Sequence, residues 1–171
     1  MDFIASFWGI IWEILGWFQI CTFIDPWEEG IVVRRGKFSR IIGPGIAWHL
    51  PFAIDDIHTM NVKPAAMELD EQVLTTADGK QIILAAVLMW SIFDIKKIFL
   101  NVENASATLS DILVGFIHEL VERSTWDYIR TPQFLVELKR IIQPTARKYG
   151  ISVSTVKLHD LAETRVYRLI T

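Results

Sequence analysis

The stretch E-E-G-I-V-V-R-R-G-K-F (28–38) determines how the rest of this 171-residue chain is interpreted. Its β-branched residues, followed by Gly36 and Lys37, predict a strand, a tight turn and a second strand. A further turn is expected at G-P-G (43–45). The next segment, I-A-W-H-L-P-F-A-I (46–54), is apolar, and its proline favours an edge strand or an exposed loop over a central strand. The stretch therefore begins a run of short antiparallel strands.

The same β pattern continues to residue 93. Residues 57–69 alternate loosely between apolar and polar, and Pro64 again favours an edge position. A strand at 72–76 leads through an Asp-Gly turn into Q-I-I-L-A-A-V-L-M-W-S-I-F (81–93). The unbroken apolar character of this last segment predicts a long and deeply buried strand. We therefore expect residues 26–93 to form an antiparallel β lobe.

The second half of the chain changes from strand patterns to helix patterns. Apolar residues recur at three- and four-residue spacing, with Asp, Asn, Ser or Thr at the predicted helix starts. We expect residues 94–171 to form a helix-rich α/β lobe, and the whole protein to be of the α+β class. The predicted elements are a short helix at 94–100, a helix from Asn104 or Ser106 through Glu122, a helix from Pro132 that bends near Pro144 and ends before Gly150, and a strand at 151–158.

An apolar leader precedes the two lobes. Residues 3–24 form a mostly apolar run of 22 residues, which as a helix reaches roughly 33 Å, enough to cross a hydrocarbon core of about 30 Å. Glu13 costs on the order of 3 kcal/mol near the bilayer centre, and the Leu, Ile and Phe side chains return roughly 5 kcal/mol. A cleaved signal peptide does not fit, because the segment has no basic start and no A-x-A-like cleavage site. We expect a retained membrane helix in residues 1–25.

On a helix, the leader has two different faces. Gly9, Glu13 and Gly16 follow three- and four-residue spacing and share a face of small or polar residues. In lipid such a face packs helices together, so we expect it to mediate self-packing in a homo-oligomer. The alternatives are a helix that lies flat in the interface and a simple single-span anchor. The aromatic residues expected in the membrane segment are Phe3, Phe7, Trp8, Trp12, Trp17, Phe18 and Phe23.

Charge is distributed unevenly along the chain. Residues 1–27 contain no Lys or Arg and carry the whole formal net charge of −3, and no strongly basic surface points to nucleic acid as a partner. Basic residues begin soon after the leader, so the positive-inside rule places the body of the protein on the cytoplasmic side of the membrane. The single cysteine, Cys21, excludes an intramolecular disulfide. It lies near the membrane boundary, where S-palmitoylation and a small apolar filler are the two interpretations.

The sequence contains no complete motif for catalysis or cofactor binding. The four histidines are scattered, and H-E-L-V-E (118–122) lacks the second histidine of a zinc-protease motif. There is no glycine-rich phosphate-binding motif and no G-x-S-x-G nucleophile turn. We therefore expect no catalytic residue, no metal site and no cofactor.

Several segments follow one another in a specific order along the chain. After the leader and residues 28–38 come G-P-G-I-A-W-H-L-P-F (43–52), V-L-T-T-A-D-G-K-Q-I (73–82), L-K-R-I-I (138–142) and Y-G-I-S-V-S-T-V-K-L-H-D-L (149–161). This ordered set resembles the SPFH or Band 7 family, which includes stomatins, prohibitins and flotillins. The resemblance is to the stomatin-like type, because a membrane leader is followed at once by the domain. Members of the family usually continue into a long charged helix, whereas this sequence ends at Thr171, so the resemblance implies a minimal member.

The resemblance implies that the first β lobe lies against the bilayer. Membrane contact is then expected from the apolar loop that contains Trp48, Phe52 and Ile54, and the alternative is ordinary packing beneath the hairpin. Basic residues of the hairpin are expected to contact lipid headgroups, and the alternative is a solvated hairpin. These basic residues are Arg34, Arg35, Lys37 and Arg40.

The resemblance further implies a membrane-anchored homo-oligomer of many subunits that organises membrane proteins and lipids in a ring or cage. The alternative is a partner-dependent modulator of a membrane protease or channel, without large self-assembly. A membrane-anchored hydrolase is not supported, because the sequence shows no motif with a nucleophile and a base. A small pore-forming protein is supported only by Glu13 in the leader. We therefore expect a non-enzymatic scaffold whose repeated anchors strengthen membrane binding by avidity.

Overall fold

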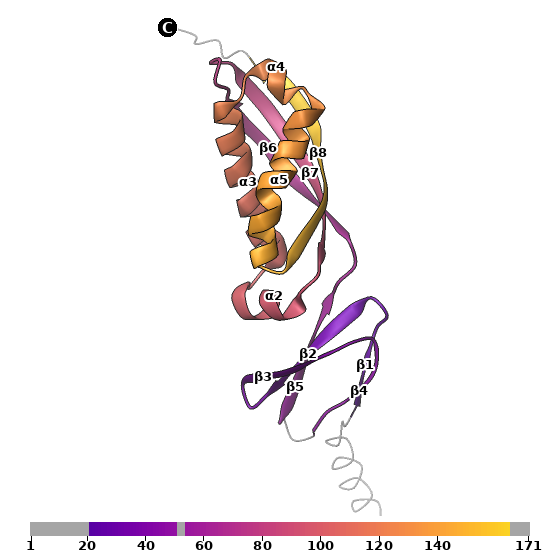
Figure 1. Ribbon diagram of the computed structural model, residues 1–171. Helices are drawn as coiled ribbons and strands as arrows, with labels where there is room; N and C mark the ends of the chain where they lie inside the picture. Colours follow the sequence, from indigo (N-terminus) through magenta and orange to yellow (C-terminus); the bar gives the residue numbers. More distant parts are fainter. Residues whose placement is uncertain (1–20, 51–53, 165–171) are drawn as a thin grey trace, which may run out of the picture. The chain divides into compact units, whose positions relative to one another are not determined.

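The computed structural model describes residues 21–50 and 54–164, which belong to two compact units (Figure 1). The first unit ends at Val62 and the second begins at Lys63. None of the helices within the described residues is long and apolar enough to span a bilayer. Residues 3–20 of the predicted leader helix, with most of its aromatic residues and its small-residue face, lie outside the described residues.

The predicted hairpin forms the centre of the first unit. Strand β2 (Glu28–Arg34) pairs antiparallel with β3 (Lys37–Ile42), and β5 (Asp55–Asn61) pairs with the other edge of β2. The turn lies at residues 35–36, one residue earlier than predicted, and both residues have positive φ angles, of 49° and 75°. Positive φ at both positions matches the strand twist in a two-residue hairpin, and glycine adopts it without strain at position 36.

A two-stranded ribbon completes the first unit. Strand β1 (Cys21–Ile24) pairs antiparallel with β4 (Gly45–Trp48). The prediction that the leader helix continues to residue 24 is therefore wrong for residues 21–24, because pairing with β4 holds them extended. A Cβ placed on Gly30 of β2 would lie 3.2 Å from Ile24 Cδ1 and 2.8 Å from Ile42 Cγ1. Glycine thus lets β1 and β3 side chains approach the β2 backbone closely.

The second unit is built on a three-stranded antiparallel sheet in the order β6-β7-β8. Strands β6 (Ala65–Thr75) and β7 (Gln81–Ile92) form a hairpin, and β8 (Ile151–Thr164) pairs with the other edge of β7. The expected division between residues 93 and 94 differs from the observed units, because β6 and β7 pair with the C-terminal strand β8. The strand patterns of the sequence therefore located strands without showing which strands share a sheet.

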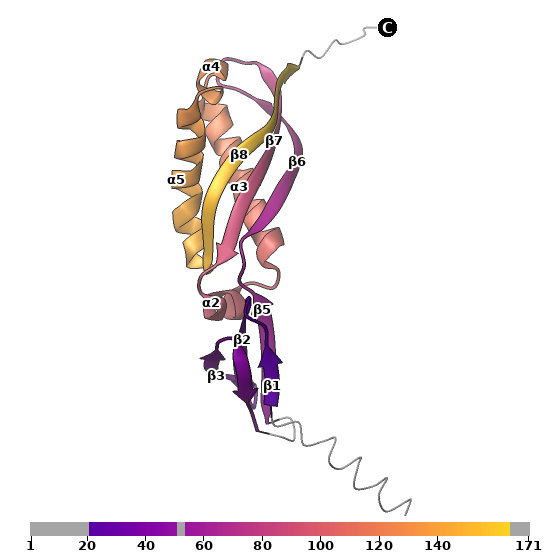
Figure 2. The ribbon, with the colours of Figure 1, turned by 90° about the vertical axis from the view of Figure 1, so that its right-hand side faces the viewer.

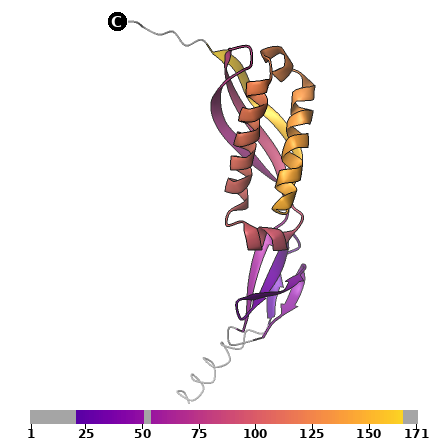
Figure 3. The same ribbon diagram turned by 60° about the vertical axis from the view of Figure 1, so that its left-hand side comes forward.

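Two long helices lie side by side on one face of this sheet (Figures 2 and 3). These are α3 (Ala105–Arg123) and α5 (Pro132–Lys148), while α2 (Ile95–Asn101) and α4 (Trp126–Ile129) precede them in the chain. The side chain of Asn104 accepts a hydrogen bond from the Ala107 N–H at 3.1 Å and caps α3. Of the two predicted starts, Asn104 and Ser106, the helix therefore uses Asn104. Fully buried residues between helices and sheet include Leu84, Leu88, Leu109, Leu113, Ile117, Leu138 and Ile142.

Strand β7 is more deeply buried on one face than on the other. Leu84 and Leu88, which belong to the core described above, are fully buried. Ile83 and Val87 are only half-buried, and Met89 is exposed. The strand is therefore less deeply buried than its apolar sequence predicts, because the long helices cover a single face of the sheet (Figure 2).

Candidate functional site

The ribbon of β1 and β4 presents apolar side chains to solvent. In an antiparallel pair, residues directly opposite each other point to the same face. The register places Phe23 opposite Ile46 and Cys21 opposite Trp48, so these four residues share one face. Phe23, Ile46 and Trp48 are 76%, 58% and 64% exposed, respectively. We call this surface the apolar ribbon face.

The opposite side of the ribbon supplies its packing within the first unit. Ile24 and Ala47 are buried there, at 4% and 6% exposure. Thr22 Oγ1 lies 3.2 Å from His49 Nε2, and this hydrogen bond joins β1 to the residue directly after β4. Since the inner side already joins the ribbon to the hairpin, the apolar ribbon face is not part of the core of this unit. Contiguous exposed apolar surface of this kind marks an interaction site.

A buried carboxylate fixes the chain directly after the ribbon. Arg34 donates to Asp55 from Nε at 2.7 Å and from Nη2 at 3.0 Å, and the Leu50 N–H donates to Asp55 at 3.0 Å. The hydrogen bond from the Arg34 side chain, followed by that from Leu50, lowers the pKa of Asp55 to about 2. Asp55 therefore stays ionised at neutral pH and ties the segment after β4 to the hairpin.

The four basic residues predicted to meet lipid headgroups divide into two pairs. Arg34 binds the buried carboxylate, and Arg40 Nη2 donates to the Trp48 carbonyl at 2.6 Å, so both hold the ribbon in place. Arg35 is exposed in the turn between β2 and β3, and Lys37 is exposed at the start of β3. The structural roles of Arg34 and Arg40 were not predicted from the sequence. Contact with headgroups stays a prediction for all four.

Some of the remaining predicted contact residues lie in or near the ribbon, and the others lie outside the described part of the chain. Trp48 is on the apolar ribbon face, Ile54 is half-buried directly before β5, and Cys21 is half-buried in β1. Ile46 was not among the predicted residues, and the two-residue period of G-I-A-W (45–48) is the signal that identifies it. The predicted residues outside the described part of the chain are Phe52 in the loop, Gly9, Glu13 and Gly16 on the self-packing face, and Phe3, Phe7, Trp8, Trp12, Trp17 and Phe18.

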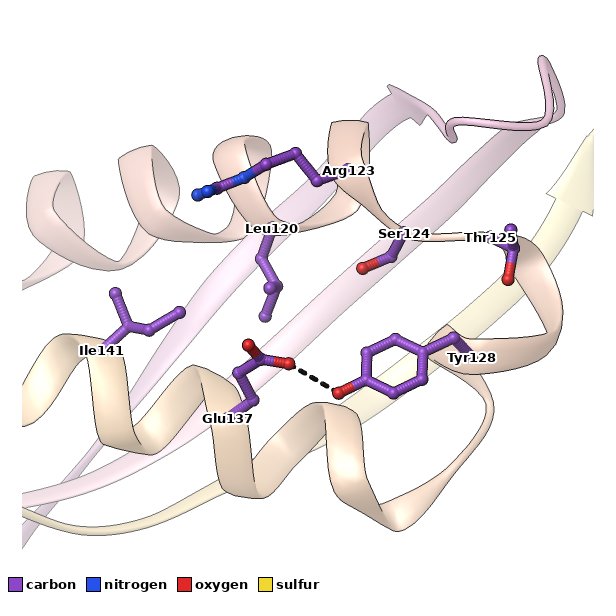
Figure 4. Close-up of a pocket in the computed structure, with 7 residues that line it drawn as sticks. All are labelled: Leu120, Arg123, Ser124, Thr125, Tyr128, Glu137 and Ile141. Atoms are coloured by element: carbon purple, nitrogen blue, oxygen red, sulfur yellow. Dashed lines mark hydrogen bonds between the residues drawn. The ribbon is translucent and has the colours of Figure 1, made fainter.

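A pocket of about 360 Å³ lies in the second unit among the end of α3, α4 and α5 (Figure 4). The Tyr128 hydroxyl donates to Glu137 at 2.5 Å, and this hydrogen bond raises the pKa of Tyr128. The pair thus joins α4 to α5 through a neutral phenol and a carboxylate. Within residues 21–50 and 54–164, no group of three or more His, Cys, Asp or Glu side chains is placed to hold a metal ion.

The fold and the apolar ribbon face define a class of α+β domain with antiparallel sheets and an exposed interaction surface. The chain belongs to the SPFH domain / Band 7 family, whose family model matches residues 22–168. The resemblance inferred from the ordered segments is thus confirmed. Proteins of this family are typically membrane-associated, and they act as scaffolds or modulators rather than as enzymes. The prediction that the chain is not an enzyme is therefore also confirmed.

Three curated relatives show how the similarity is distributed. The chain is 24% identical over 153 residues to the Modulator of FtsH protease HflK of Escherichia coli, covering 88% of this chain and 35% of that protein. It is 26% identical over 145 residues to the stomatin-like protein stl-1 of Caenorhabditis elegans, covering 83% and 44%. It is 27% identical over 128 residues to Protein HflK of Vibrio cholerae, covering 75% and 31%. The chain thus spans less than half the length of these relatives.

Proposed function

We propose that this protein is a membrane-anchored, homo-oligomeric scaffold that organises membrane proteins and lipids. The observation that carries the proposal is the apolar ribbon face, which exposes Phe23, Ile46 and Trp48. Its first strand, β1, is the end of the apolar run in the sequence. At a bilayer interface these side chains remove apolar area from water. Family membership supports the proposal, since SPFH proteins are typically membrane-associated.

Each copy contributes a membrane contact of moderate strength. A Phe or Trp side chain offers about 150–250 Å² of area, and about 25 cal/mol is gained per Å² removed from water. With Phe23 76% exposed and Trp48 64% exposed, complete burial of either side chain is worth on the order of 3 kcal/mol. Many such contacts in one assembly act together through avidity, so the oligomer binds far more firmly than a single copy.

The proposal includes the side of the membrane on which the body lies, the packing of the leader helices and the contacts with headgroups. The body lies on the cytoplasmic side, supported by the basic residues that follow a leader without Lys or Arg. The leader helices pack on one another through Gly9, Glu13 and Gly16. Arg35 in the hairpin turn and Lys37 directly after it are exposed and contact anionic headgroups.

A label at a single position tests the membrane contact. Cys21 is the only cysteine in the sequence, so Cys21→Ala leaves a background in which one new cysteine can be labelled. A polarity-sensitive fluorophore at Ile46→Cys is expected to shift to the blue in lipid vesicles and to be quenched by lipid-attached quenchers. The control is the same fluorophore at Thr155→Cys, an exposed position on β8, which should show neither effect. Equal behaviour of the two labels would overturn the contact between the apolar ribbon face and the bilayer.

A second candidate function is modulation of a membrane protease without large self-assembly. It is favoured by the similarity to HflK of Escherichia coli, a protein named as a modulator of the FtsH protease. The mass of the 171-residue chain extracted in detergent separates the two functions. A large, uniform assembly of 19.7 kDa subunits supports the scaffold. A monomer or dimer refutes a large assembly of the isolated chain and favours the modulator.

A further inference from the structure

The two long helices of the second unit carry opposite charges. The outer surface of α3 exposes Asp111, Glu119 and Glu122. Glu119 forms an ion pair with Arg123 at 2.5 Å, so Asp111 and Glu122 carry the uncompensated negative charge of this surface. Helix α5 carries four basic side chains and one carboxylate, and Arg140 and Arg147 are exposed. Helix α3 packs on β6, which has three carboxylates and no basic residue, while α5 packs on β8. The unit therefore has an acidic edge and a basic edge.

The basic edge is grooved. Helix α5 and the start of β8 line a groove of about 530 Å³ that includes Val136, Lys139, Arg140 and Arg147. Val136 is apolar and yet 69% exposed. It also lines an adjoining groove of about 320 Å³ at the start of α5, together with Pro132 and Arg140. An exposed apolar residue with a basic rim fits a partner surface that is acidic and has a small or apolar centre.

The acidic face of α3 has a centre of this kind. Gly115 lies between Asp111 and Glu119 at four-residue spacing and is exposed. A Cβ added at Gly115 would meet no atom within 4 Å, so no packing among the described residues requires glycine there. Glycine within an exposed helix is less favourable than alanine. A close approach by another molecule is a structural reason for glycine at this position.

Both edges of the sheet are interrupted where strand addition would occur. Strand β6 has a bulge before Gln72, whose Nε2 donates to the Asp70 carbonyl at 3.3 Å. Strand β8 has an irregularity at Ser154, whose carbonyl accepts a hydrogen bond from Lys139 and whose hydroxyl donates to the Met89 carbonyl. Bulges and charged side chains at edges oppose strand pairing between molecules. This arrangement favours contact through side chains over extension of the sheet.

We propose that the groove between α5 and β8 of one copy binds the outer face of α3 of a second copy. Val136 packs at Gly115, and the basic rim faces Asp111 and Glu122. The inference rests on the proposed homo-oligomeric function and assigns the lateral contact within it. Because the two surfaces differ, the contact is head-to-tail, and its repetition gives a ring when the rotation closes. The contact is charge-dependent, so high salt weakens it.

The test reverses one surface at a time in the whole 171-residue chain. Arg140→Glu with Arg147→Glu makes the groove acidic, and Asp111→Arg with Glu122→Arg makes the α3 face basic. In each variant like charges face each other, so the detergent-extracted assembly is expected to fall to monomers or dimers. Lys157→Glu changes a charge that lies exposed on β8 and outside both surfaces. This control is expected to keep the wild-type mass.

Mixing the two variants is the decisive step. The acidic groove of one variant then meets the basic α3 face of the other, and the two unaltered surfaces also match. An equimolar mixture is expected to recover a large assembly that contains both variants, which also shows that neither variant is misfolded. The inference is overturned if the wild type is large and either variant stays large, or if the mixture stays dissociated. A wild type that is monomeric overturns the proposed self-assembly itself, and this contact with it.

Discussion

Replacing Gly115 by Gln is expected to change folding and assembly in opposite directions. The position is exposed, and a Cβ there meets no atom within 4 Å, so the new side chain enters open solvent in the separate chain. In a helix interior glycine is about 0.8–1.0 kcal/mol less favourable than alanine, and glutamine is close to alanine. The substitution should therefore raise the free energy of unfolding by about 0.5–1 kcal/mol.

In the assembly, the glutamine side chain would occupy the space in which Val136 of the neighbouring copy packs. Complete burial of a valine side chain is worth about 1.5–3 kcal/mol. Since 69% of Val136 is exposed in one copy, its burial contributes on the order of 1–2 kcal/mol to each contact. Loss of this packing should weaken each contact by about five- to thirtyfold.

Two measurements separate the effects. Unfolding in urea, followed by circular dichroism, is carried out in the variant with Arg140→Glu and Arg147→Glu, where self-association does not add to stability. The mass of the detergent-extracted protein is measured in the wild-type background. Gly115→Ala is the matched control, with a similar gain in stability and a smaller loss of mass. If Gly115→Gln stabilises the fold and leaves the mass of the assembly unchanged, Gly115 is not part of the contact. If the substitution destabilises the fold, the argument from helix propensity is refuted.

Three further predictions concern the fold. Gly30→Ala places a Cβ 2.8 Å from a side-chain carbon of β3 and should destabilise the protein by about 1–3 kcal/mol in urea unfolding. Gly43→Ala is the control and should not destabilise the protein, because its Cβ meets nothing within 4 Å. Equal stability of the two variants would show that the β3 side chain moves aside without cost. The pKa of Asp55 falls from 3.8 to about 2 on folding, so its stabilisation is present above the unfolded pKa and is lost as the pH falls toward 2. Asp55→Asn should lack this part of the acid transition, and an unchanged acid titration would contradict the role of the carboxylate. The hydrogen bond to Glu137 raises the pKa of Tyr128, so its ultraviolet phenolate signal should appear at a higher pH than that of a free tyrosine side chain. Glu137→Ala should lower that pH.

Much of the secondary structure could be predicted because short-range patterns determine it. The hairpin at 28–38, the strand that the structure has at Gln81–Ile92 and the cap at Asn104 all depend on neighbouring residues. Residues 21–24 could not be assigned in this way, because C-T-F-I is as apolar as the end of a membrane helix. Their extended conformation depends on β4, whose paired residues lie more than 20 positions further along the chain.

The candidate site shows the same limit. Membrane contact by Trp48 was expected from the family resemblance together with the apolar, proline-containing loop, and it stays a prediction. Asp55 was not predicted, since two adjacent aspartates after an apolar segment look like surface charge in the sequence. Its role follows from Arg34, which lies 21 positions away and reaches it only in the folded unit. Interactions between distant residues therefore account for the part of the site that the sequence did not predict.

The ion pair of Arg34 and Asp55 is expected to withstand the lower pH at the surface of an anionic membrane. An anionic leaflet at about −30 to −50 mV concentrates protons roughly three- to sevenfold at its surface, a drop of less than about one pH unit. A carboxyl group with a pKa of about 2 remains ionised through such a drop at neutral bulk pH. Its hydrogen bond from the Leu50 N–H therefore persists in the proton-rich layer at an anionic bilayer. The joint between the ribbon and the hairpin is thus insensitive to the surface charge of the membrane that we propose it contacts.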